Sequence, residues 1–182
     1  NYFEYLKSRS LKGLLYRNFV VYPQIRNHVR GKLLDLGCGI GDMLKFYPNS
    51  VGVDINPHTV EYCNARGLEA YLMDSDLLPF EAKSFDTILL DNVLEHIKEP
   101  SHLLLEICRV LTDSGRLIIG LPGEKGFLMD PDHKVNYNRM DLFKILDTIN
   151  MKIMSEFSTP IKSDYLNRIF ARYCNYYIAV KL

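Results

Sequence analysis

The stretch that decides the fold is Leu33-Leu34-Asp35-Leu36-Gly37-Cys38-Gly39-Ile40-Gly41-Asp42, and Val51-Gly52-Val53-Asp54 follows it closely. An apolar run enters a turn with three alternating glycines, and a second apolar run ends in an acid. Glycines let a ligand approach the backbone closely, and an acid at the tip of the next strand can bind a ribose diol. The pattern predicts a nucleoside site at the edge of a parallel sheet.

The spacing of the glycines argues against a dinucleotide, and an NAD(P) oxidoreductase stays only as a third alternative. Counted from Gly37 or from Gly39, the last position of the G-x-G-x-x-G fingerprint falls on Asp42 or on Leu44. Asp35 and Asp42 place negative charge beside the turn, which repels a pyrophosphate and favours a ligand with positive charge and no phosphate. S-adenosylmethionine (SAM), with its ammonium, sulfonium and adenosine, is such a ligand.

Two plainer interpretations of this stretch stay open. The glycines could form a tight strand-to-helix turn that binds nothing. Asp54 could cap the helix that Asn56-Pro57 predicts, because proline favours the first helical turn.

Composition indicates an ordinary globular enzyme. The chain of 182 residues is long enough for one domain with a full core, so we expect a single domain over 1–182. No apolar run reaches the roughly 20 residues that a membrane span needs. The four cysteines are scattered without metal-type pairs, which favours reduced thiols in a cytoplasmic protein: Cys38, Cys63, Cys108 and Cys174.

The charge is unevenly distributed, although the net charge is zero and argues against a nucleic-acid substrate. Residues 1–32 hold seven Lys or Arg and one Glu. This segment reads as helical and is expected to break near Pro23. It is either a solvated helical face or, in the sharper hypothesis, a lid over 1–31 that covers the cofactor and attracts an anionic acceptor.

The order of elements predicts an α/β fold. Strands are expected at about 32–36, 50–54, 69–73, 85–90, 115–121, 151–158 and 174–180. Helices are expected at about 41–47, 57–66, 100–111, 139–149 and 163–172. The alternation predicts a Rossmann-like, open, seven-stranded and mostly parallel sheet over 32–182, with helices on both faces and an antiparallel last strand.

Further candidate residues follow the expected strands. Ligands of open α/β sheets bind at the carboxyl ends of the strands. Asp74 is therefore expected near the purine edge, unless it only forms a turn before Pro79. Asp91 and Asn92 leave the fourth strand at the same end, where the methyl group would be presented.

Two histidines are candidates for catalysis. Glu95 and His96 could be an acid/base pair or metal ligands, but an ordinary helix start is the commoner role, and no metal ligand is predicted. His133 lies in the long segment 123–138 and is the best-placed general base, because the pKa of an unperturbed imidazole, near 6.5, suits proton removal at neutral pH. The alternative is a surface histidine.

These motifs resemble those of class I SAM-dependent methyltransferases, in particular the small methyltransferase-11-like group similar to the ubiquinone/menaquinone-biosynthesis enzymes. Asp35–Gly41 looks like the first motif of that family, and Val53–Ile55 looks like its ribose-binding acid with the apolar neighbour of adenine. Asp74-Ser75 with Leu78–Phe80 is similar to the adenine segment, and 85–117 resembles the next strand, helix and strand. The resemblance is strong over about 32–121 and weak over 133–155.

The resemblance implies a role for each matching residue. The turn of Gly37, Cys38, Gly39 and Gly41 would pass under the methionine part, and Asp35 would orient it or meet the ammonium. Asp54 would bind the ribose hydroxyls, Ile55 would pack on adenine, and Asp74 with Ser75 would contact its edge.

The reaction that the resemblance implies is transfer of the sulfonium methyl to an acceptor, with His133 or His96 as base for an oxygen acceptor. The zero net charge and the basic N-terminal segment favour a small-molecule acceptor, such as an anionic sugar or a lipid-linked precursor. The alternative is a non-catalytic SAM-binding subunit that supports a partner enzyme.

Overall fold

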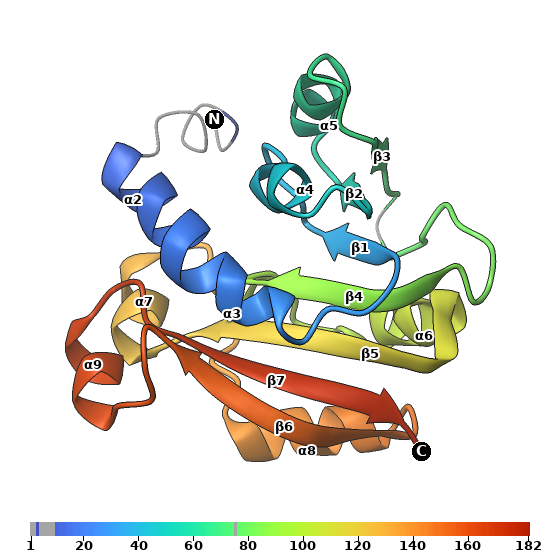
Figure 1. Ribbon diagram of the computed structural model, residues 1–182. Coiled ribbons are helices and arrows are strands. Elements are labelled where there is room, and N and C mark those ends of the chain that lie inside the picture. Colours follow the sequence, from blue (N-terminus) through green and yellow to red (C-terminus); the bar gives the residue numbers. More distant parts are fainter. Residues whose placement is uncertain (1–2, 4–9, 75) are drawn as a thin grey trace.

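The computed structural model describes residues 3, 10–74 and 76–182. Seven strands form one sheet in the order β3-β2-β1-β4-β5-β7-β6 (Figure 1). Their bounds are β1 Leu33–Leu36, β2 Ser50–Asp54, β3 Ala70–Leu72, β4 Phe85–Asp91, β5 Leu111–Pro122, β6 Met151–Thr159 and β7 Cys174–Lys181. The first five pair in parallel, and β7 pairs antiparallel with both β5 and β6. The predicted fold class is confirmed, including the antiparallel last strand.

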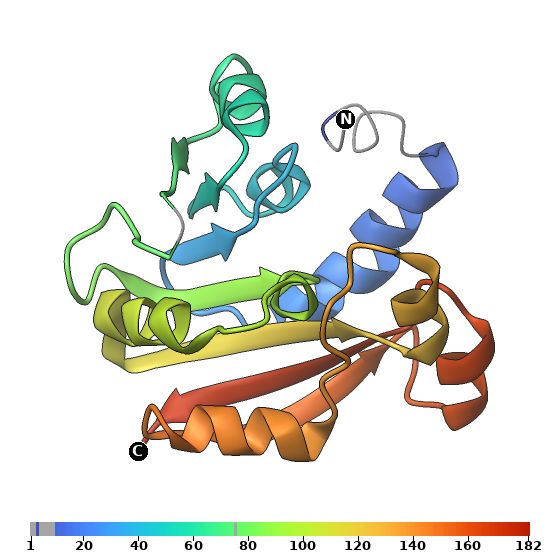
Figure 2. The same cartoon turned by 180° about the vertical axis from the view of Figure 1, so that it is seen from behind.

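Helices connect the strands and cover both faces of the sheet (Figures 1 and 2). Between the parallel strands lie α4 Asp42–Phe46, α5 Pro57–Asn64 and α6 Ser101–Val110, while α8 Arg139–Asp147 precedes β6 and α9 Asp164–Ile169 precedes β7. A short 3₁₀ turn, η2 Leu94–His96, follows β4. The segment 123–138, expected to be a loop, also contains the helix α7 Glu124–Met129.

Alternation along the strands divides the core between the two faces of the sheet. In β4, Ile88 and Leu90 pack with one cluster, which includes α6 and α8, while Leu89 between them packs with the other. The same period of two recurs in β5 and β7, as expected of strands whose side chains alternate between the faces. All three of these β4 residues are fully buried because both faces of the sheet are covered.

The N-terminal helix continues through Pro23 instead of breaking there. It runs as α2 Leu11–Tyr16, a π-helical segment η1 Arg17–Val21 and α3 Tyr22–Arg26. In the π-helical segment the Tyr22 amide donates to the Arg17 carbonyl, five residues back. The Gln24 side chain donates to the Val20 carbonyl at 3.2 Å. The predicted break is wrong because the wider π-helical turn before Pro23 leaves room for the proline ring, so the chain stays helical through this residue.

Part of the predicted lid belongs to the core. Val21, Tyr22 and Ile25 are at most 4% exposed and pack against the sheet. A covering role for the residues before them stays a prediction. Among the described residues, no helix has the length and apolar character that crossing a membrane requires.

Candidate functional site

The glycine turn joins β1 to α4 at the carboxyl ends of the central strands. Gly37, Gly39 and Gly41 have φ values of +79°, +51° and +75°, the left-handed region that glycine enters without steric cost. The amides of Gly37 and Cys38 both donate to the Val53 carbonyl, at 2.8 and 3.0 Å. The turn is thus fastened to the end of β2, and its shape depends on backbone that only glycine tolerates.

Two of the glycines also lie where no side chain fits. A Cβ atom added to Gly37 would lie 2.6 Å from Val93 Cγ2, and one added to Gly41 would lie 2.6 Å from Leu68 Cδ1. The contact with Val93 places the residues that follow β4 directly over the glycine turn.

Asp54 ends β2 and is 7% exposed. Its Oδ2 accepts from the Gly39 amide and its Oδ1 accepts from the Asn56 amide, each at 2.9 Å. A carboxylate offers about four acceptor sites, so capacity for a ligand's hydroxyls remains. The helix cap itself comes from another side chain, because Asn56 Oδ1 accepts from the His58 amide. The neighbouring Ile55 is 69% exposed and offers an apolar surface beside the acid.

Asp35 lies under the turn and is 5% exposed. Burial, reinforced by the carboxylate of Asp91, raises its pKa to about 7, although the Arg17 guanidinium lowers it in part. A positively charged ligand at this point would favour the ionised carboxylate.

The Cys38 side chain faces the protein interior. It packs with Leu44, Val60 and Cys63, and a Cβ atom on Gly52 would lie 2.6 Å from its sulfur. The hydrogen bond with Cys63 and burial raise the pKa of the Cys38 thiol. Any contact of Cys38 with a cofactor would therefore come from its backbone.

The residues expected at the purine edge lie in the turn after β3. Asp74 is exposed, and its carbonyl accepts from the Leu77 amide at 3.1 Å. Leu77 is 64% exposed beside it. Ser75 lies outside the described residues.

Asp91, at the end of β4, is held by residues that sequence reasoning missed. Its Oδ2 lies 2.6 Å from an Arg17 nitrogen, and its Oδ1 accepts from the Tyr176 hydroxyl at 2.8 Å and from Asn92 Nδ2 at 2.9 Å. The Asp91 side chain is 6% exposed. These partners make it a buried structural anchor for the N-terminal helix. Two features of the sequence could have indicated the Arg17–Asp91 pair. An acid at the end of a buried strand needs a cation, and residues 1–32 carry an excess of basic side chains.

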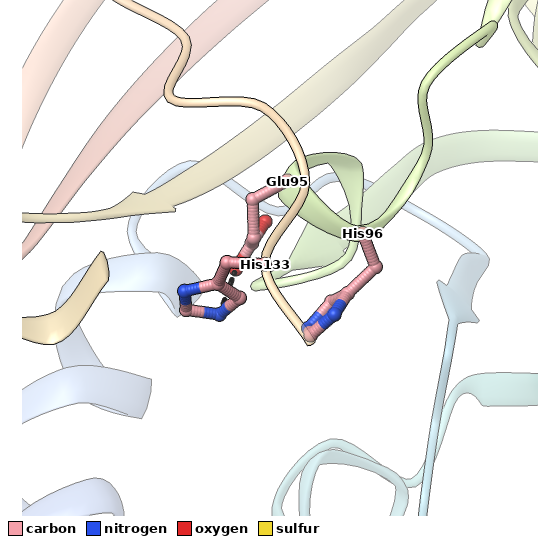
Figure 3. A group of neighbouring side chains, drawn as sticks. All are labelled: Glu95, His96 and His133. Carbon is pink, nitrogen blue, oxygen red and sulfur yellow. Dashed lines mark ion pairs between the residues drawn. The ribbon is translucent and has the colours of Figure 1, made fainter. Parts of the chain in front are cut away.

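Glu95, His96 and His133 form a second group of functional side chains (Figure 3). Glu95 and His96 lie in η2, which begins directly after Val93, the residue over the glycine turn. His133 comes from the segment after α7. One ligand atom of each lies within 4.8 Å of the others. The structure thus brings together the two histidines that the sequence proposed separately, 37 positions apart.

Each histidine is oriented by a backbone carbonyl. His96 Nδ1 lies 3.2 Å from the Asp132 carbonyl oxygen, and His133 Nδ1 lies 3.0 Å from that of Phe127. The His133 side chain is only 7% exposed, so the expectation of a surface histidine is excluded. The Glu95 carbonyl accepts from the amides of Lys134 and Val135, which fixes the segment after α7 against η2.

The Glu95 carboxyl group is 1% exposed, and both of its oxygens lack a hydrogen-bond partner among the described residues. Burial raises its pKa to about 8, with a further contribution from the Asp91 carboxylate. Its Oε1 lies 3.7 Å from His133 Nε2. A buried acid of this kind is a frequent mark of a functional site.

Comparison with known proteins finds similarity to methyltransferases. Residues 34–119 match the family described as a methyltransferase domain. An uncharacterized protein of Methanocaldococcus jannaschii is 30% identical over 61% of this chain and 57% of its own length. A protein of Mycolicibacterium smegmatis named as a probable S-adenosylmethionine-dependent methyltransferase is 26% identical over 80% of this chain and 64% of its own. Probable tRNA methyltransferase 9B of Homo sapiens is 33% identical over 54% of this chain and 24% of its own.

Solved structures agree on the fold. A chain of the Haloferax volcanii complex between the Trm112 methyltransferase activator and a methyltransferase superposes with a TM-score of 0.75. It is 17% identical, and the match covers 93% of this chain and 92% of that one. Because the chain spans 57%, 64% and 24% of the length of these three relatives, the comparison concerns the shared domain.

Proposed function

The chain carries a class I SAM-dependent methyltransferase domain with SAM as its cofactor, and on this premise we propose that it transfers the SAM methyl group to a small-molecule acceptor. The single observation that supports this most strongly is the glycine turn fastened to Asp54 and covered by Val93. At one edge of the sheet this arrangement combines a backbone turn that glycine forms without strain, a buried acid and the residues that follow β4.

In this proposal each group has a task toward the cofactor. The glycine turn takes the methionine part, Asp54 takes the ribose, and Ile55, Asp74 and Ser75 take the adenine. Asp91 acts indirectly, because Arg17 and Tyr176 already hold its carboxylate. We withdraw it as a direct cofactor contact.

The acceptor side is assigned to Glu95, His96 and His133. The sulfonium activates its own methyl group, so alignment of the acceptor supplies most of the acceleration. An oxygen acceptor must also lose a proton, and these three titratable side chains gather in and against η2, just beyond the residue Val93 that lies over the glycine turn.

Apolar side chains near this edge favour the lipid-linked form of the acceptor. Leu11, Leu15 and Phe19 of the N-terminal helix are 47–76% exposed, and Leu128 and Met129 of α7 are 63–81% exposed. Both elements lie beyond the carboxyl ends of β4 and β5 (Figure 2). Arg17 is paired with Asp91, which removes one of the charges that the anionic-acceptor hypothesis used.

The first experiment measures SAM binding by titration calorimetry. Asp54→Ala is expected to weaken binding by about 1–3 kcal/mol, the cost of losing charge-assisted hydrogen bonds. Asp113→Ala is the matched control, because Asp113 is exposed in a surface pair with Lys83. Equal affinities of both variants for SAM would contradict the site.

The second experiment identifies the acceptor class with SAM labelled in its methyl group. Purified protein is incubated separately with a lipid extract, a water-soluble metabolite extract and total tRNA. We expect label in the lipid extract. Label in tRNA would overturn the small-molecule assignment, and SAM binding without transfer to any fraction would favour the non-catalytic subunit.

A further inference from the structure

The group of Glu95, His96 and His133 has the donor set of a metal centre. Within the described residues these three side chains come together from two segments, and both oxygens of the 99%-buried Glu95 lack a hydrogen-bond partner there. Leaving a buried carboxyl group unpaired is costly, so such a group in a folded protein calls for an occupant.

The backbone bonds of the histidines fix which nitrogen is available. A carbonyl oxygen only accepts, so Nδ1 of His96 and Nδ1 of His133 must each carry the hydrogen. In the neutral imidazole this leaves Nε2 of both rings with a free lone pair. Histidines that bind metals are commonly oriented in this manner, with the other ring nitrogen donating to a backbone carbonyl.

The free lone pair on His133 Nε2 points toward carboxylate oxygens, which accept hydrogen bonds, and not toward hydrogen-bond donors. Its Nε2 lies 3.7 Å from Glu95 Oε1 and 3.8 Å from Asp130 Oδ2. Lone pairs that converge on one point repel unless a proton or a cation lies between them. We propose that Glu95, His96 and His133 bind one divalent transition-metal ion of the zinc class.

The geometry suits such an ion after a small closure. Ligand atoms on zinc lie about 2.0–2.2 Å from the metal, so two of them in a tetrahedral site are about 3.3–3.6 Å apart. The present separations are at most 4.8 Å, so the ligand atoms must approach one another by up to about 1.3 Å. The partly exposed His96 can shift while its Nδ1 stays bonded to the Asp132 carbonyl. Two imidazoles and one carboxylate suit zinc and its neighbours, and three protein ligands leave a coordination position open.

The open position gives the ion a task that rests on the proposed function. An acceptor hydroxyl bound there would lose its proton to solvent, because a metal ion lowers the pKa of a bound oxygen. The oxygen would then attack the SAM methyl carbon, and the carbon–sulfur bond would break with its electron pair going to sulfur. The products are the methyl ether, S-adenosylhomocysteine and the released proton.

The test uses Co²⁺ as a spectroscopic probe with the full 182-residue chain after treatment with chelator. We expect visible absorption that saturates at one Co²⁺ per chain and that Zn²⁺ abolishes by displacement. Glu95→Gln, His96→Gln and His133→Gln should each weaken Co²⁺ binding by at least about 100-fold, the upper end of what outer-shell changes cost. His102→Gln, an exposed histidine on α6, is the matched control and should bind as the unchanged chain does.

Three results would overturn the metal site. They are the absence of saturable Co²⁺ binding, Co²⁺ binding that the three cluster variants share with the control, and Co²⁺ absorption unaffected by Zn²⁺. Thermal melting of each variant separates lost ligation from lost folding. Calorimetry with SAM separates the two proposals, since SAM binding without Co²⁺ binding contradicts this inference alone, whereas Co²⁺ binding without SAM binding contradicts the proposed function.

Discussion

The proposed cofactor edge of this protein and its proposed acceptor side are assembled in opposite ways. The glycine turn, Asp54 and Ile55 come from one stretch of about 20 residues, and their contacts are made mainly by backbone amides. The acceptor side joins distant segments through side chains, with Arg17 on Asp91 and His133 against Glu95. Local backbone geometry can therefore define the proposed cofactor edge, whereas tertiary packing must define the proposed acceptor side.

The largest effect is expected from breaking the anchor of the acceptor side. Arg17→Leu leaves Asp91 buried without its cation, which should reduce the free energy of unfolding by about 3 kcal/mol. Urea denaturation measures this, and adding Asp91→Asn to the same chain should restore much of the loss. Arg139→Leu, which removes an exposed pair with Glu156, should cost less than about 1 kcal/mol. Equal losses for the two arginine variants would show that the Arg17 pair is no anchor.

The next effect depends on pH and concerns Glu95. Burial raises its pKa to about 8 from an ordinary value of 4.5, so between these values the folded state retains a proton that the unfolded state has lost. The stability contributed by this group therefore falls as the pH rises through that window. In chelator, Glu95→Gln should be more stable than the unchanged chain by a few kcal/mol at pH 8.5, and by less at pH 5.5.

Thermal or urea unfolding at the two pH values checks this difference. Glu99→Gln, an exposed carboxyl nearby in the sequence, should show no comparable trend. A Glu95→Gln advantage that stays constant with pH would mean that Glu95 has no perturbed titration.

The smallest effect is expected from replacing single glycines. It separates the cost of a strained backbone from the cost of a side chain that collides with a neighbour at the cofactor edge. Gly37 and Gly67 have similar φ values, +79° and +72°, but only at Gly37 would an added Cβ atom meet a neighbour, Val93. Gly67→Ala should cost about 1 kcal/mol of stability from strain alone and leave SAM affinity unchanged. Gly37→Ala should cost about 2 kcal/mol and also weaken SAM binding, as measured by urea unfolding and calorimetry. Similar SAM affinities for both variants would show that the fit at Gly37 is unimportant.

The sequence predicted most of the sheet, because alternating apolar runs and glycine turns are local signals. It placed Asp54 at the tip of β2 and the last strand antiparallel, and both expectations agree with the structure. It was wrong about the break at Pro23, because a π-helical turn accommodates that residue. It also missed the helix α7 inside the presumed loop.

The sequence alone could not predict the contacts of the acceptor side, because they join residues that lie far apart in the chain. Tyr176 and Arg17 reach Asp91 from positions 85 and 74 residues away, and no pattern of spacing encodes such pairs. Asp91 was expected to face the ligand because its place after β4 was visible and its partners were not. His133 and Glu95 were each noticed, but their proximity depends on tertiary contacts, such as the bonds from the amides of Lys134 and Val135 to the Glu95 carbonyl.

The position of β7 between β5 and β6 sets the order in which the sheet can be completed during synthesis. β6 pairs with β7, so it has no place in the sheet until residues 174–181 have emerged from the ribosome. Until then β5 presents an open edge, and open edges recruit strands from other chains. A nascent chain stalled before Cys174 should therefore need a chaperone that shields sheet edges, whereas the earlier parallel strands can already pair among themselves.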